Sequence, residues 1–149
     1  MSDFDVYTYM EKLKAAIDGA DFLSFVLYLK KVSEAGLLED AIDKNEFETP
    51  LSYALRVMNL ENGNLVFVEE LLKKGASPDV WDAEIDTPLM KAAGTGNTEL
   101  ANLLLKYGAN VDLMDGDHTW TVWDVAYSAN QTEMLTLLEK HGAKSGQEY

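Results

Sequence analysis

The sequence predicts an all-α protein built from a helix–turn–helix segment that recurs about every 33 residues. Three aligned segments begin with a threonine and end with a glycine: Thr49–Gly75, Thr87–Gly108 and Thr121–Gly142. The threonine-to-glycine spacing is 26 residues in the first segment and 21 in the other two, so the first carries five extra residues between its halves. This regular spacing, with apolar residues at helical intervals, favours repeated helices over strands.

Each segment also signals where its helices begin and end. Threonine followed by proline starts a helix, because the hydroxyl oxygen can cap a free backbone N–H and proline fits the first helical position. A break containing asparagine separates this helix from a second amphipathic helix, such as the one expected around 98–107. The closing glycine suits the left-handed conformation that often ends a helix. We therefore expect two helices per segment, followed by a turn.

The second segment carries Thr87-Pro88-Leu89, Ala92-Ala93, Gly96, Leu103-Leu104-Leu105 and Gly108-Ala109. In these motifs it resembles the ankyrin repeat almost throughout, and the resemblance covers about two-thirds of the chain. It implies one domain, 1–149, that is an ankyrin-repeat solenoid. The expected parts are a divergent N-terminal helical cap (1–38), three repeats (39–79, 80–112 and 113–144) and a tail (145–149).

Some positions depart from the family's motif. The position that usually carries histidine holds Ser52, Met90 or Asp124, which removes the family's usual hydrogen-bonding side chain. The last repeat has Trp123 where leucine is usual, and we expect this tryptophan in the core. Residues 1–38 lack Thr-Pro-Leu and form either the cap or an unrelated helical hairpin. We expect the C-terminal tail to be frayed.

The chain is strongly acidic and has no cysteine. Its 26 acidic and 12 basic residues give a formal net charge of -14, which repels phosphate backbones and anionic lipids. We therefore expect no nucleic acid or membrane partner, and a protein partner with a basic surface. Lack of cysteine excludes disulfides and fits a reducing compartment. The first residues show no signal-peptide pattern, so we expect a cytoplasmic protein that is monomeric when free.

Residues 115–120, DGDHTW, contain residue types that can bind metals or transfer protons. A calcium loop would need glutamate at its twelfth position, where Ala126 stands. The chain has one histidine besides His118, and that residue, His141, falls at an expected helix end, where it would meet unpaired carbonyls. We therefore expect no metal ion, no cofactor and no catalytic residue. Placed by the repeat, the segment is an exposed turn.

The turns between the repeats concentrate the acidic residues. Residues 39–48, 79–86 and 112–118 contain 12 of the 26 acids. The ankyrin resemblance implies that such turns line up along one edge, which would make that edge acidic. Acidic side chains around exposed aromatic ones suit a basic protein partner.

Several residues in these turns are the expected partner contacts. Trp81 and Trp120 occupy positions that are variable and solvent-facing in the family, whereas Phe47 or Leu113 either joins them or tucks into the stack. Exposed aromatic side chains commonly supply the binding energy of protein interfaces. The full set of expected contacts is Glu48, Trp81, Glu84, Asp86, Met114, Asp117, His118 and Trp120.

These expectations predict a non-enzymatic protein–protein interaction module that uses acidic and aromatic turns and a concave face. A specific hypothesis is an immunity protein or inhibitor that neutralises a basic enzyme or toxin, because a small acidic domain can occlude a basic site. The alternative within the binding class is an adaptor or regulatory scaffold subunit. A rival from another class is an enzyme or small-molecule binder with its site in the groove near Asp124.

Overall fold

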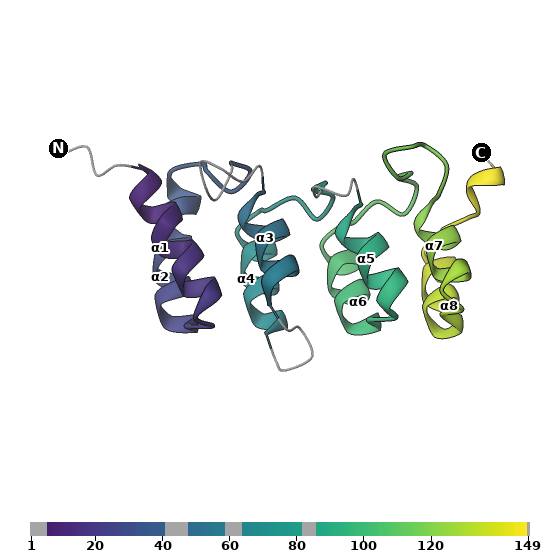
Figure 1. Cartoon of the computed structure of the whole chain (residues 1–149), viewed down its shortest axis with the longest axis horizontal. Coiled ribbons are helices and arrows are strands. Elements are labelled where there is room, and N and C mark those ends of the chain that lie inside the picture. The colour runs from purple at the N-terminus through teal and green to yellow at the C-terminus, as the bar shows by residue number, and fades with distance from the viewer. Residues whose placement is uncertain (1–5, 41–47, 59–63, 82–85, 149) are drawn as a thin grey trace. The chain divides into compact units, whose positions relative to one another are not determined.

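The structure is a computed structural model of the chain that describes residues 6–40, 48–58, 64–81 and 86–148. In these ranges it contains eight α-helices and a short 3-10 helix, and its only strand-like feature is one isolated antiparallel bridge. The chain forms two compact units, residues 1–77 and 78–149 (Figure 1). The all-α expectation is confirmed. None of the described helices has the length and apolar content needed to cross a bilayer.

The first unit consists of two helix pairs. Helices α1 (Val6–Asp18) and α2 (Phe22–Glu34) form one pair, and α3 (Pro50–Val57) and α4 (Leu65–Lys73) form the other. Helix α1 packs against α3, and α2 packs against α4. Fully buried side chains fill the unit's core: Leu13, Ile17, Phe25, Leu29, Leu51 and Leu71. The extra residues of the first repeat fall between α3 and α4, and 59–63 lie outside the described residues.

The second unit repeats the same arrangement. Helices α5 (Pro88–Thr95) and α6 (Thr98–Lys106) pair, as do α7 (Val122–Ser128) and α8 (Thr132–Lys140). Helix α5 packs against α7 and α6 against α8, and the short 3-10 helix η2 (Gly146–Glu148) follows. The core side chains of this unit are Leu89, Met90, Leu104, Met134 and Leu138.

The expected helix boundaries are confirmed. Threonine is the N-cap residue of α3, α5 and α7: Thr49, Thr87 and Thr121. In each case its hydroxyl oxygen accepts a hydrogen bond from the backbone N–H three residues later. Past the ends of α4, α6 and α8, the glycines have φ angles of 100°, 88° and 84°: Gly75, Gly108 and Gly142. These angles lie in the left-handed region, where a side chain would be strained. His141 contacts a last-turn carbonyl, with Nδ1 2.9 Å from the oxygen of Leu137.

Trp123 is half-buried, so the expectation that it is a core residue is wrong. Its ring stacks on that of Tyr127, with centroids 5.1 Å apart and an interplanar angle of 11°. Its Nε1 donates a hydrogen bond to Glu139 Oε1 at 3.1 Å. The corresponding Leu89 is 1% exposed in a helix that packs against α7. Among the described residues no further helix packs on α7 in that way, which leaves the larger tryptophan partly in solvent.

Candidate functional site

The loop between α6 and α7 is organised by the carboxylate of Asp115. Its Oδ1 accepts hydrogen bonds from the backbone N–H groups of Thr119 at 2.8 Å and Trp120 at 3.1 Å. The N–H of Asp115 donates to the carbonyl of Trp120 at 2.8 Å, and Met114 and Thr121 pair in the antiparallel bridge. Asp115 therefore stabilises the turn itself.

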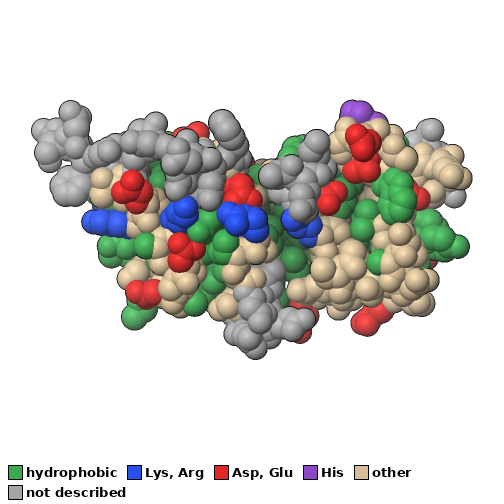
Figure 2. Space-filling model, viewed as in Figure 1, with side chains coloured by type: hydrophobic (Ala, Val, Ile, Leu, Met, Phe, Trp, Pro, Cys, Tyr) green, Lys and Arg blue, Asp and Glu red, His purple; other side chains and the backbone are tan. Residues whose placement is uncertain are grey.

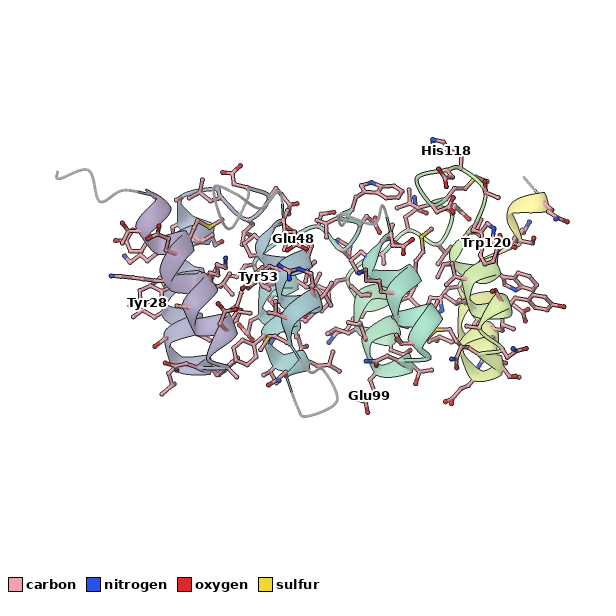
Figure 3. All side chains as sticks on the ribbon, viewed as in Figure 1. Tyr28, Glu48, Tyr53, Glu99, His118 and Trp120 are labelled. Atoms are coloured by element: carbon pink, nitrogen blue, oxygen red, sulfur yellow. The ribbon has the colours of Figure 1, made fainter. Side chains whose placement is uncertain are left out.

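His118 stands at the tip of this loop (Figure 3). It is exposed, with φ of 54°, and its N–H donates to the carbonyl of Asp115 at 2.8 Å. Asp117 is also exposed, whereas Met114 is half-buried. In the described part of the chain no cluster of three or more histidine and acidic residues could hold a metal ion. The loop thus presents its imidazole and carboxylate to solvent.

Two exposed indoles lie on consecutive turns of the second unit. Trp81, before α5, is 43% exposed, and Trp120, before α7, is 41% exposed. The turns are linked, because Asp79 Oδ1 accepts a hydrogen bond from the N–H of Asn110 at 2.9 Å. Figure 2 shows carboxylates and an imidazole gathered over the same unit. Large apolar side chains beside charges make these turns a candidate docking surface.

The remaining expected contacts of these turns are less exposed or outside the described residues. Asp86 is half-buried. Leu113, which was expected either to join the exposed contacts or to tuck into the stack, is also half-buried. Glu84 and Phe47 lie outside the described residues. The docking surface is therefore defined by the six described residues of the second unit, hereafter the docking turns: Trp81, Asp86, Met114, Asp117, His118 and Trp120.

Glu48, another of the expected contacts, is largely buried in the first unit. It is 7% exposed, and its Oε2 lies 2.7 Å from Nη2 of Arg56. Nε of Arg56 also donates to Oε1 at 3.0 Å and to Oε2 at 2.8 Å. This forked geometry is the strong form of an ion pair. Glu48 thus anchors the start of α3, a role that sequence spacing alone did not reveal.

A second network in the first unit joins α1 to α3. The hydroxyl of Tyr53 donates to Asp18 Oδ1 at 2.5 Å. The Tyr53 ring lies beside two cations, with Lys14 Nζ and the Arg56 guanidinium carbon each 5.1 Å from its centroid. The surface between these helices therefore mixes cations with carboxylates, and it is less suited to a basic partner than the docking turns are.

Asp124, at the third position of α7, fixes the C-terminal segment. Its Oδ2 accepts from the N–H groups of Thr121 at 2.9 Å and Gly146 at 2.7 Å, and its Oδ1 accepts from Ser145 Oγ at 2.7 Å. Burial alone would raise the pKa of Asp124, but these hydrogen bonds hold it below its ordinary value. The expectation of a frayed tail is therefore wrong for residues 145–146. Both carboxylate oxygens are engaged in this structural role.

An open pocket of about 400 Å³ adjoins Asp124, and His118, Trp120 and Tyr127 are among its lining residues. Tyr127 is 63% exposed and was not an expected contact. Its position in the repeat could have indicated its exposure. The corresponding residue of α5, Ala93, is small and fully buried, whereas tyrosine is too large for such a buried place. Among the described residues, no helix packs tightly over this bulky side chain.

Sequence comparisons relate the chain to ankyrin-repeat proteins. The family model for ankyrin repeats (3 copies) matches residues 57–148. A putative ankyrin repeat protein of Fowlpox virus is 34% identical over 104 residues, which are 64% of this chain and 16% of that protein. Human ankyrin repeat and SOCS box protein 6 is 32% identical over 83 residues, 56% of this chain and 20% of that protein. The potassium channel AKT2/3 of Arabidopsis thaliana is 30% identical over 133 residues, 86% of this chain and 16% of the channel. The chain thus spans a fifth or less of these relatives.

Proposed function

This chain belongs to the ankyrin-repeat family, and on that premise we propose that it binds a protein with a basic surface through the docking turns. Ankyrin repeats are protein–protein interaction modules. The observation that carries the proposal is the pair of exposed indoles, Trp81 and Trp120, on consecutive turns of one unit. Tryptophan is enriched among the residues that dominate binding energy, because it buries a large apolar surface with few rotatable bonds.

Charge supports a basic partner. The sequence of the second unit contains twelve aspartates and glutamates and four lysines. Among the docking turns, Asp117 is exposed beside His118, and Asp86 is half-buried. A field of one sign accelerates encounter with an oppositely charged protein and disfavours partners of like charge. The cation-containing surface of α1 and α3 lacks this bias.

The proposal is tested by quantitative capture from the cells in which the protein occurs. The full chain serves as bait, alongside Trp81→Ala and Trp120→Ala. Each variant is expected to bind the partner about thirtyfold more weakly, because loss of a central tryptophan typically costs about 2 kcal/mol or more. Leu23→Ala is the matched control, since Leu23 is 84% exposed on α2 of the first unit. Equal loss with Leu23→Ala, or no loss with either tryptophan variant, would contradict the proposal.

A finer proposal is that the chain neutralises an enzyme or toxin by covering a basic site. Support comes from its net charge of -14 and from the exposed docking turns. An adaptor role is a second candidate, favoured because the relatives contain the matching segment within much longer proteins. One equivalent of the chain should abolish the captured partner's activity if it is an inhibitor, and should leave that activity intact if it is an adaptor.

A further inference from the structure

The pocket beside Asp124 is lined by residues from separate segments of the second unit, three of them aromatic. His118 and Trp120 come from the α6–α7 loop, Tyr127 comes from α7, and Gln147 comes from η2. Its volume of about 400 Å³ admits one long side chain of a partner. Trp120 belongs both to this pocket and to the docking turns, so a partner seated on the turns reaches the pocket.

Two parts of the pocket wall, the Tyr127 ring and the Trp120 backbone, are held by contacts within the second unit. Tyr127 is 63% exposed, yet its ring stacks on Trp123, whose Nε1 is bonded to Glu139. The backbone of Trp120 is fixed by hydrogen bonds to and from Asp115. A ring that is already stacked, such as that of Tyr127, loses little conformational entropy on binding.

The charge in the pocket is negative. Asp124 is one of the lining residues, and its low pKa keeps it ionised at neutral pH. The hydrogen bonds that it accepts come from neutral donors, the N–H groups of Thr121 and Gly146 and the hydroxyls of Ser145 and Thr121. These donors stabilise the carboxylate but bring no positive charge to cancel it. Asp117, next to His118 in the chain, is exposed nearby and adds to the negative field.

We propose that this pocket receives an arginine side chain of the protein partner, with the guanidinium against the Trp120 and Tyr127 rings and facing the Asp124 carboxylate. The proposal rests on the proposed function and names the chemistry of one partner residue. Cations bind aromatic faces, and the planar guanidinium also stacks on them. The Asp124 carboxylate would repel an anionic group. An apolar group would displace water from this carboxylate without offering a hydrogen bond in its place.

The experiment uses the full chain and two blocked pentapeptides, Gly-Ser-Arg-Ser-Gly and the same peptide with citrulline in place of arginine. Citrulline keeps the shape of arginine without its charge. Binding is followed through the indole N–H signal of Trp120 in proton–nitrogen NMR spectra. We expect a saturable shift with the arginine peptide and about tenfold weaker binding of the citrulline peptide.

Variants locate the site. Tyr127→Leu should weaken binding of the arginine peptide about fivefold, because the exposed ring is lost while an apolar side chain remains. Leu23→Ala should bind the arginine peptide as the wild type does, since Leu23 lies on α2 of the first unit and does not line the pocket. The comparison of arginine with citrulline on the wild-type chain is independent of how any variant folds.

Equal binding of the two peptides, or shifts confined to residues away from the pocket, would overturn the arginine proposal. That result would leave the proposed function standing if capture of the partner still depends on Trp81 and Trp120. The proposed function fails separately if neither tryptophan variant alters capture, whichever peptide binds. Binding of the arginine peptide that Tyr127→Leu does not weaken would also contradict the proposed site.

Discussion

The carboxylate of Asp124 accepts a hydrogen bond from the backbone N–H of Gly146 at 2.7 Å, which ties the start of α7 to the C-terminal segment. The same side chain forms a capping box with Thr121, whose N–H donates to Oδ2 at 2.9 Å. One residue thus caps a helix and holds the segment that forms a pocket wall. Oδ2 serves both functions, and Oδ1 adds the hydrogen bond from Ser145 that also holds the C-terminal segment.

Replacing Asp124 with asparagine is expected to lower the free energy of unfolding by about 1–3 kcal/mol, because the amide keeps one acceptor oxygen and loses the charge. Urea unfolding at pH 7 measures the change. Asp117→Asn is the matched control, since Asp117 is exposed and should change stability by less than about 0.5 kcal/mol. Equal losses in the two variants would show that Asp124 has no special structural role.

The contribution of Asp124 to the free energy of unfolding should decrease at acidic pH. Its pKa in the folded state lies below the ordinary value of 3.8, so the stabilisation is complete above that value and is lost as the pH falls through the lower, folded-state pKa. The stability difference between the wild type and Asp124→Asn should therefore be constant from about pH 7 to 5 and shrink below about pH 4. Urea titrations across this range test it. Loss of the difference already at pH 5 would contradict the assignment.

Tyr53→Phe removes the hydroxyl that bonds to Asp18 and should destabilise the protein by about 1 kcal/mol. Tyr28→Phe is the control in the same unit. The ring of Tyr28 lies 5.5 Å from Lys12 Nζ, a contact that phenylalanine also allows. Denaturant unfolding of both variants gives the comparison. A larger loss for Tyr28→Phe would place the important hydroxyl elsewhere.

Glu48→Gln should cost about 1 kcal/mol, because it removes the charge of a largely buried carboxylate that pairs with the half-exposed Arg56. Glu99→Gln, at an exposed position in the first turn of α6, should change stability by about 0.5 kcal/mol or less. Thermal unfolding of the two variants measures both losses of stability. If Glu48→Gln were neutral and also weakened partner capture, Glu48 would be a contact after all.

The fold was predictable because the helix boundaries marked by threonine and glycine have local causes. Thr87 and Pro88 start a helix and Gly108 ends one through short-range hydrogen bonding and backbone sterics, which sequence spacing records directly. Recurrence of the same signals then identified the repeat. The exposed indoles of Trp81 and Trp120 followed from their place in the repeat as well.

The features that escaped prediction depend on what lies nearby in space. Trp123 was expected in the core by analogy with Leu89, but its burial depends on a neighbouring helix that α7 lacks among the described residues. Glu48 looked like a turn acid until the structure placed Arg56 against it. The C-terminal segment is ordered by Asp124, more than twenty residues earlier, which no local pattern indicates.

The most direct test of partner binding by the docking turns compares two charge reversals in the second unit. Asp117→Lys alters an exposed residue beside His118, whereas Glu99→Lys alters an exposed residue at the other end of the same unit (Figure 3). Both change the net charge equally. Affinity for the captured partner is measured for both variants at low and high salt.

We predict that Asp117→Lys weakens binding about fivefold at low salt, that high salt narrows this difference, and that Glu99→Lys stays within about twofold of the wild type. Equal effects of the two reversals on affinity would show that only the net charge of the chain matters, and not the position of the charge in the docking turns. No effect of Asp117→Lys at low salt would contradict binding of a basic partner at this surface.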